Sequence, residues 1–376
     1  MRHVHSTQGM VIHQYHFSVS PGDAITNQMF FIYRSLRQAG IESRIYADHI
    51  RGGLSKWVNR FNEAELWNCD LLLLHHSHGN PQLQKLLGIE VPKALIYHNI
   101  TPEHFFRHDP HMWNLCRIGR SQLKLIRQAV STTFVDSRFN GRELKDLGFT
   151  DPIHFPLFDI GVMMAEVSNS QPRREKGKIK LLFVGKIAPH KNQIALLRTL
   201  SYLPPEYELT LVGSADPIYL DYVKLTARAL GVHSRVQILG KVPEKDLKRA
   251  YQESWAFLST SLHEGFGVPL IEAMVHQLPV FAINSGAVAE TLDDAGVLFN
   301  TEKPWELAAV LKTFLAHPEA IKAAIARQNQ RLEALRAGES QERVQTICRD
   351  LVHHLRVVPE CDWKKEAANI ARQLET

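Results

Sequence analysis

The sequence predicts an α/β protein with two similar domains, each built on a parallel sheet. Its 376 residues are too many for one ordinary core and are typical of about two domains. Short apolar segments, among them 70–76 and 179–184, alternate along the chain with segments whose apolar residues recur at helical spacing. This alternation indicates βαβ units, in which ligands bind at the carboxyl edge of the strands.

Composition narrows the class of protein. The chain is 44% hydrophobic and 22% charged, which is typical of a globular protein. It has no apolar stretch near the roughly 18 to 20 residues that cross a bilayer, and no apolar signal segment at its start, so we expect it in the cytoplasm. Its four cysteines are scattered along the sequence, which indicates neither a disulfide framework nor a zinc site.

The net charge of +5 is modest, and many of the positive residues fall in helical segments such as 117–127 and 241–249. We interpret these residues as solvated helix faces. The alternative is that they contact phosphates or an anionic membrane surface. No stretch interleaves basic and aromatic residues in the way that stacks bases, so we expect no nucleic-acid partner.

The first predicted βα turn has features of a ligand-binding loop. Residues 11–17 predict a strand, and the helix that follows ends at Gly40 before a second strand at 41–47. Gly22 and Asp23 lie in the turn between strand and helix, where a glycine lets the backbone approach a ligand closely. The turn lacks a Gly-x-Gly-x-x-Gly fingerprint, so a dinucleotide site is not predicted.

Histidines stand at the carboxyl ends of two further predicted strands. His75 and His76 end the strand at 70–76, and His98 lies near the end of the strand at 93–99. One such histidine is often only a satisfied core residue, but parallel strands end at one edge, and this convergence predicts at least one functional residue. Adjacent strand residues point to opposite faces, so His75 and His76 are not expected to share a metal ion.

A polar segment without apolar periodicity, 168–178, predicts the boundary between the domains. We expect a first domain at 1–168, a second at 169–356, and a C-terminal helix within 357–376 that packs back on the first domain. The first domain should also contain a helix, a strand and a second helix at 118–130, 132–135 and 137–147.

The second βα series opens with the strand at 179–184 and a loop from Gly185 to Lys191. Lys186 and Lys191 in this loop could neutralise a diphosphate, although a solvated loop is the alternative. The series continues with strands expected at 208–212, 236–239, 255–259, 279–283 and 296–299, and with helices ending at 200 and 230 and spanning 244–251, 269–276 and 304–355.

Two carboxylates flank a glycine-bracketed turn in the stretch from Ser261 to Glu272. The turn should join a buried strand to a helix, with Glu264 in the loop and Glu272 about one turn into the helix. A helix N-terminus at the carboxyl edge of a parallel sheet is a site where anions bind. A glutamate near a helix N-terminus can also be only a favourable dipole partner, so the pair by itself leaves both interpretations open.

The segments Phe-Val-Gly-Lys-Ile-Ala-Pro-His-Lys at 183–191 and His-Glu-Gly-Phe-Gly-Val-Pro-Leu-Ile-Glu-Ala-Met at 263–274 resemble those of retaining glycosyltransferases of the GT-B fold, family 4 (group 1). The resemblance covers nearly the whole chain and includes 21–24, 97–102 and 136–140. It implies two Rossmann-like βαβ domains that face a central cleft, with the C-terminal helix crossing back to the first domain.

The resemblance also implies roles for individual residues, with the acceptor on the first domain and the nucleotide-sugar donor on the second. The implied catalytic side chains are Glu264, His98, Lys186 and Lys191. The implied donor-binding residues are Gly22, Asp23, Gly185, Val242, Gly265, Phe266, Gly267, Val268 and Glu272. Many relatives have arginine in place of Lys186, so bidentate phosphate binding is lost there and a point charge remains.

The implied function is the retaining transfer of a hexose, such as mannose or glucose, from a nucleotide sugar to a polysaccharide or lipid-linked glycan in cell-surface glycan synthesis. The lysines and the helix N-terminus already supply positive charge and no Asp-x-Asp occurs, so neither a metal nor another cofactor is expected. Residue spacing alone does not distinguish same-face attack from a double displacement. The alternative is a catalytically silent nucleotide-sugar-binding or scaffolding subunit of a polysaccharide assembly. In either case we expect a cytoplasmic protein, with the inner face of the membrane as a further location.

Overall fold

The protein divides into two compact units, which we describe separately. The first unit contains the described residues up to Phe155 together with those from Ala337 onward, and the second runs from Ile160 to Arg336. The boundary predicted at 168/169 and the helix predicted within 357–376 lie outside the described residues. The computed structural model describes residues 9–155, 160, 163–164, 177–300, 303–338, 344–347 and 349.

The first unit contains a seven-stranded sheet with the order β5-β3-β1-β6-β7-β8-β9. Every described strand pair in it is parallel. Its strands are β1 (Val11–Tyr15), β3 (Glu42–Ala47), β5 (Val58–Arg60), β6 (Leu71–His76), β7 (Lys93–Tyr97), β8 (Thr132–Val135) and β9 (Ile153–His154). A small parallel pair that the sequence did not predict is formed by β2 (Ser18–Val19) and β4 (His49–Ile50).

Seven helices connect these strands within the described part of the first unit. They are α1 (Ala24–Gln38), η1 (Leu54–Lys56), α2 (Glu63–Leu66), α3 (Leu83–Gly88), η2 (Glu103–Phe106), α4 (Pro110–Ala129) and α5 (Arg138–Asp146). The sequence placed the start of α4 at 118, whereas the helix begins at Pro110. The Asp109 side chain caps it by accepting hydrogen bonds from the His111 and Met112 amides, and proline is favoured in a first turn.

Strand β6 shows why a continuous apolar run is needed in the middle of this sheet. Leu72 and Leu74 lie in one buried cluster together with residues of α4, and Leu71 and Leu73 lie in a second cluster together with residues of α1. Successive side chains of a strand point to opposite faces, so both faces of β6 are covered. The same alternation continues into His75 and His76, which therefore end on different faces, as predicted.

The second unit contains a six-stranded sheet with the order β12-β11-β10-β13-β14-β15, and its described pairs are also parallel. Its strands are β10 (Ile179–Val184), β11 (Tyr207–Val212), β12 (Val236–Gly240), β13 (Ala256–Ser259), β14 (Val280–Ile283) and β15 (Val297–Phe299). Its helices are η3 (Pro189–Lys191), α7 (Gln193–Ser201), α8 (Pro217–Ala229), η4 (His233–Arg235), α9 (Glu244–Glu253), α10 (Val268–Val275), α11 (Val288–Leu292), α12 (Pro304–Leu315) and α13 (Pro318–Gly338).

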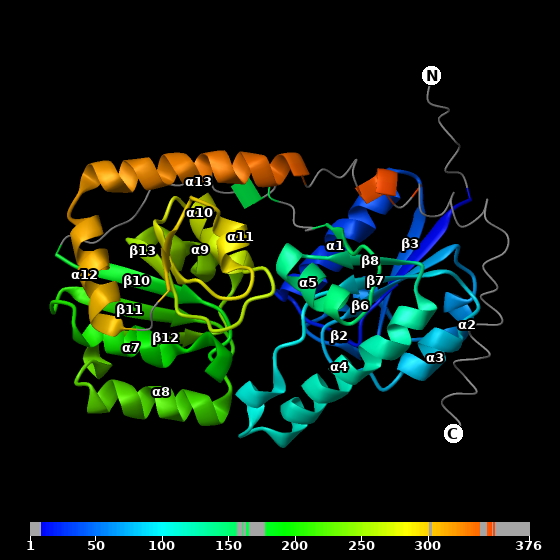
Figure 1. The fold of residues 1–376 in the computed structure, drawn as a ribbon, viewed down its shortest axis with the longest axis horizontal. Helices are drawn as coiled ribbons and strands as arrows, with labels where there is room; N and C mark the ends of the chain where they lie inside the picture. The colour runs from blue at the N-terminus through cyan, green and yellow to red at the C-terminus, as the bar shows by residue number, and fades with distance from the viewer. Residues whose placement is uncertain are drawn as a thin grey trace. The chain divides into compact units, whose positions relative to one another are not determined.

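Helices cover both faces of the second sheet. Figure 1 shows α7, α8 and α12 along one side of the sheet and α9, α10 and α11 along the other, and residues of the first three share one buried cluster with β10 and β11. The sequence predicted continuous helix from 304, but α12 and α13 are separate because Pro318 starts a new helix. None of the helices among the described residues has both the length and the apolar character that crossing a membrane requires.

A short helical segment late in the chain, 344–347, packs on the first unit. Val344 is fully buried in the cluster that also contains Phe31 and Leu36 of α1. The Gln345 side chain donates a hydrogen bond of 2.9 Å to the Ser35 carbonyl oxygen. The chain therefore returns to its first unit after it has completed its second.

Candidate active site

An ion pair joins two strand-to-helix loops of the second unit. The Lys191 Nζ atom lies 2.6 Å from the Glu264 Oε1 atom, and the two side chains are 17% and 14% exposed. Lys191 ends η3, which follows β10, and Glu264 lies between β13 and α10. Because β10 and β13 are parallel neighbours, their carboxyl ends bring both loops to one edge. The sequence predicted this edge for both residues but did not predict that they bond to each other.

A third loop fixes the backbone at Glu264. The Ala287 amide donates to the Glu264 carbonyl oxygen at 2.9 Å, and the Ser285 hydroxyl donates to the Ser261 carbonyl oxygen at 2.5 Å. Gly286 lies between them, and a Cβ atom there would be only 2.2 Å from the Glu264 carbonyl oxygen. A residue with a side chain would therefore push this loop away, so the position of Glu264 depends on a glycine that the sequence analysis did not identify.

The turn from Gly265 to Val268 leads into α10. Gly267 caps the helix with φ 93°, a left-handed conformation that favours glycine. Phe266 is buried, and its carbonyl oxygen accepts a hydrogen bond of 2.5 Å from the Thr291 hydroxyl. The first amides of a helix carry partial positive charge and bind anions. The N-terminus of α10 therefore lies beside Glu264 and carries the partial positive charge that favours binding of a diphosphate.

The loop after β10 carries two lysines and a neutral histidine. The Lys186 side chain is exposed, and its carbonyl oxygen accepts from the Gln193 side-chain amide at 3.0 Å. His190 is buried, and burial lowers its pKa well below the usual range, with Lys191 and Lys186 lowering it further. Gly185 lies so close to Gly213 that a Cβ atom on Gly213 would be 2.0 Å from the Gly185 carbonyl oxygen. Because His190 is neutral, the positive charge of this loop comes from Lys186 and Lys191.

Glu272 is bonded to a tyrosine that the sequence analysis placed in a helix without a role. The Tyr251 hydroxyl donates to Glu272 Oε2 at 2.7 Å, and its ring stacks on His276 with 4.6 Å between ring centroids. Burial raises the pKa of Glu272, and the hydrogen bond from Tyr251 opposes this rise. Val242 lies between β12 and α9. Contacts of Glu272 with ribose and of the Val242 backbone with a base stay predictions.

Gly22, Asp23 and His98 belong to the first unit. Gly22 has φ 72°, so the glycine is required by the turn itself. The Asp23 side chain caps α1 by accepting from the Thr26 amide at 2.9 Å, a helix-capping role that the sequence analysis did not assign. The structure therefore gives Asp23 a local function, and its contact with a donor stays a prediction.

His98 is held on both sides of its ring. Its Nδ1 atom lies 2.9 Å from Asp136 Oδ2, its Nε2 atom lies 2.8 Å from His75 Nδ1, and the side chain is 4% exposed. The next residue, Asn99, has φ 67° and donates to the side chains of Asn140 and Glu143. His76 faces the other way and lies 2.9 Å from the Gly119 carbonyl oxygen. The structure therefore supplies two partners of His98, Asp136 and His75, that the sequence analysis did not connect to it.

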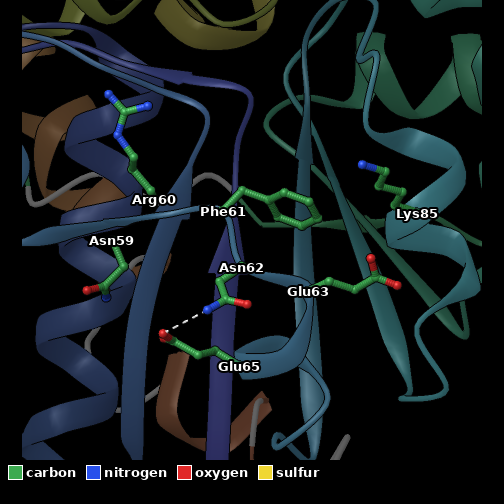
Figure 2. A pocket seen from close by; sticks show the side chains of 7 residues that line it. All are labelled: Asn59, Arg60, Phe61, Asn62, Glu63, Glu65 and Lys85. Atoms are coloured by element: carbon green, nitrogen blue, oxygen red, sulfur yellow. Dashed lines mark hydrogen bonds between the residues drawn. The ribbon is translucent and has the colours of Figure 1, made fainter.

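A polar pocket of about 550 Å³ opens where β5 ends in the first unit (Figure 2). It contains none of the residues predicted for the site. The ring of Phe61 lies among amide and charged side chains, and Asn62 donates to Glu65 at 3.2 Å. An aromatic ring with amides and carboxylates around it suits a hydroxyl-rich ligand. The pocket is lined by Asn59, Arg60, Phe61, Asn62, Glu63, Glu65 and Lys85.

Part of the second unit matches a known family. Residues 165–332 match the family described as Glycosyl transferases group 1. The O-antigen chain mannosyltransferase B of Escherichia coli is 33% identical over 124 residues, which are 31% of this chain and 32% of that protein. The O-antigen chain mannosyltransferase RfbU of Salmonella typhimurium is 30% identical over 166 residues, or 43% and 46% of the two chains. The matches thus span about a third to a half of the length of these relatives.

Solved structures resemble the chain over most of its length. The Anabaena protein HepE in complex with UDP-glucose has a TM-score of 0.70 at 19% identity, covering 92% of this chain and 100% of that one. WaaG, a glycosyltransferase involved in lipopolysaccharide biosynthesis, has a TM-score of 0.66 at 13% identity, with 91% and 99% covered. At these identities the likeness concerns the fold. The chain therefore has the predicted GT-B fold of two Rossmann-like units with parallel sheets, and its residues 165–332 are similar in sequence to the glycosyl transferases group 1 family.

Proposed function

We propose that the chain is a retaining glycosyltransferase that moves a hexose from a nucleotide sugar to a glycan acceptor without a metal ion. The observation that carries the proposal is the Lys191–Glu264 ion pair beside the start of α10. It lies in the domain that matches a glycosyltransferase family. A cation, a helix N-terminus and a carboxylate at one sheet edge are the groups that transfer from a sugar diphosphate requires.

The proposed chemistry divides the charges between the two sides of the bond that breaks. As the bond between the anomeric carbon and the diphosphate oxygen breaks, its electron pair leaves with the diphosphate. Lys191, Lys186 and the α10 amides stabilise that negative charge, and Glu264 stabilises the positive charge on the sugar. The acceptor hydroxyl then bonds to the anomeric carbon on the same face, and its proton passes to the departing phosphate. Retention follows from this same-face attack.

We propose that the second unit binds the donor and the first binds the acceptor. Two relatives are named O-antigen chain mannosyltransferases, and HepE was solved with UDP-glucose, which supports a hexose donor and a cell-surface glycan as acceptor. The polar pocket around Phe61 is a hydroxyl-compatible surface on the first unit. A cytoplasmic location and contact with an anionic membrane stay predictions.

A transfer assay tests the proposal. The purified chain is incubated with UDP-, GDP- and ADP-linked hexoses and lipid-linked or soluble glycan acceptors, with and without EDTA. We expect nucleoside diphosphate release with one donor class, a product that keeps the anomeric configuration of the donor, and an unchanged rate in EDTA. Tight binding of a nucleotide sugar with no turnover for any acceptor would instead favour a silent subunit.

Lys191 should matter for diphosphate binding. In a Lys191→Met variant we expect the affinity for the preferred nucleoside diphosphate to fall by about 1 to 3 kcal/mol, since a charged hydrogen bond is lost. The Glu264 carboxylate, then without its partner, would also repel the diphosphate. Isothermal calorimetry measures the change.

A matched lysine provides the control. Lys180 is at the opposite end of β10 and pairs with Glu253 at 2.9 Å, with side chains 22% and 23% exposed. A Lys180→Met variant should bind the nucleotide as the wild type does. Equal affinities for the Lys191→Met variant and the wild type would contradict the assignment.

A further inference from the structure

Buried polar side chains form a hydrogen-bonded row across four neighbouring strands of the first unit, β1, β6, β7 and β8. Each of these side chains follows an apolar residue of one of these strands. The four apolar residues belong to one buried cluster and are Ile12, Leu73, Ile96 and Phe134. Two residues after each of these positions, on the same face, the chain places a polar side chain. The row consists of Gln14, His75, His98 and Asp136.

Gln14 starts the row in a defined orientation. Its side-chain nitrogen Nε2 lies 3.1 Å from the Met29 carbonyl oxygen. A carbonyl oxygen can only accept, so the amide nitrogen must face Met29 and the amide oxygen Oε1 must face His75. The distance from Oε1 to His75 Nε2 is 3.1 Å. The Gln14 oxygen also can only accept, so His75 carries its proton on Nε2.

The orientation of Gln14 determines the proton count at His98. Burial lowers the pKa of His75 well below the usual range, and His98 lowers it further, so His75 is neutral and has no proton on Nδ1. That Nδ1 atom then accepts, and the Nε2 atom of His98, 2.8 Å away, must donate to it. The Nδ1 atom of His98 faces the Asp136 carboxylate at 2.9 Å. A ring that donates from both nitrogens holds two protons.

Asp136 is suited to pair with such a ring. Its second oxygen, Oδ1, accepts a hydrogen bond of 2.8 Å from the side-chain amide of Gln28 on α1. The Asp136 and His98 side chains are 7% and 4% exposed. A buried carboxylate needs a partner that supplies both charge and a hydrogen bond, and the doubly protonated ring supplies both.

Three buried histidines interact electrostatically with His98: His75 and His76 at the end of β6, and His16 after β1. Burial lowers the pKa of His16 to about 3 and that of His76 to about 4. Of the buried histidines in this group, His98 is the one with a carboxylate partner. Positive charge in the group therefore concentrates on one ring.

We propose that Gln14 acts through His75 as a positioning residue that keeps two protons on the His98 ring. The His98–Asp136 pair then holds one proton more than a neutral imidazole and a carboxylate would. Both ring nitrogens are bonded within the unit, so His98 acts on a substrate through its charge. That this charge takes part in sugar transfer rests on the proposed function, whereas the proton count does not.

Nitrogen-15 NMR of the full chain with labelled histidines tests the proton count directly, without substrate. Near neutral pH we expect two N–H groups on His98 and one, on Nε2, for His75. Signals are assigned with His75→Gln and His98→Gln variants. A single N–H on His98 in the wild type would overturn the proposal, whatever the enzyme's activity.

Two buried glutamines, 0% and 1% exposed, allow a matched comparison. Gln14→Met removes the acceptor from His75, so His75 can move its proton to Nδ1 and His98 can lose one of its two. Gln28→Met disturbs Asp136 but leaves the path from Gln14 intact, so both protons should stay. The spectrum of His98 should therefore change in Gln14→Met only. Identical His75 spectra in the wild type and in Gln14→Met would refute the role of Gln14.

Discussion

Replacing Glu264 with glutamine is expected to lower the rate of sugar transfer by roughly 100-fold or more while nucleoside diphosphate binding is retained. Glutamine keeps the shape of the side chain but lacks the negative charge that stabilises the sugar cation, and losing one such electrostatic contact typically costs about 100- to 1,000-fold in rate. The Lys191 ammonium, freed from its partner at 2.6 Å, becomes more available to the diphosphate. Steady-state transfer kinetics and calorimetry on the same preparation separate the two effects.

The control for this variant is Glu253→Gln. Glu253, the last residue of α9, pairs at 2.9 Å with Lys180 near the start of β10 and is as buried as its partner, but it is not at the edge that carries Glu264. Transfer by Glu253→Gln should match the wild type. A Glu264→Gln variant with the wild-type rate would remove Glu264 from the mechanism, and a loss of diphosphate binding as large as that of Lys191→Met would show that the ion pair only maintains the loops.

Mild acid should destabilise the first unit strongly. Burial lowers the pKa of His16 to about 3, that of His76 to about 4 and that of His75 well below its usual range, and all three residues are 3% exposed. The unfolded chain takes up three protons near pH 6.5 that the folded unit does not, so stability falls as pH decreases below 6.5. With about 1.4 kcal/mol for each histidine and pH unit, these three histidines together contribute a loss of roughly 4 kcal/mol between about pH 7.5 and 5.5.

Urea unfolding at several pH values, followed by signals from the first unit, measures this loss. In a His76→Gln variant the side-chain amide can still donate to the Gly119 carbonyl oxygen but does not titrate, so a loss of about 1.4 kcal/mol, the contribution of one histidine, should disappear. A His104→Gln variant, at an exposed position, is measured alongside for comparison. A flat stability profile down to about pH 5.5 would show that these histidines are charged in the folded state.

The sequence predicted those helices and strands whose burial produces a hydrophobic pattern over several residues. The run of leucines in β6 indicated a strand covered on both faces, and the helix end at Gly40 followed from glycine at the C′ position. The pair β2 and β4 was missed because strands of two residues have no measurable period. They form only through contact with each other, which no local pattern encodes.

The candidate site was predicted at the level of loops and not at the level of contacts. Spacing placed Glu264 in a loop and Glu272 in a helix. It did not show that Lys191 reaches Glu264, because that bond depends on the neighbouring positions of β10 and β13. Gly286 and Gln14 were missed for a related reason. Gly286 is needed because a Cβ atom at this position would lie 2.2 Å from the Glu264 carbonyl oxygen. Gln14 has its role because the folded sheet places it in a row with His75, His98 and Asp136.

The return of residues 344–347 to the first unit affects how the protein can be made. On a ribosome residues 9–155 of the first unit emerge before the second unit, yet the buried cluster of the first unit lacks Val344 until the second unit has been synthesised. Part of the apolar surface of Phe31 and Leu36 on α1 therefore stays uncovered while the second unit folds. Domains commonly fold in the order of synthesis, but here the second unit can be the first to complete its core.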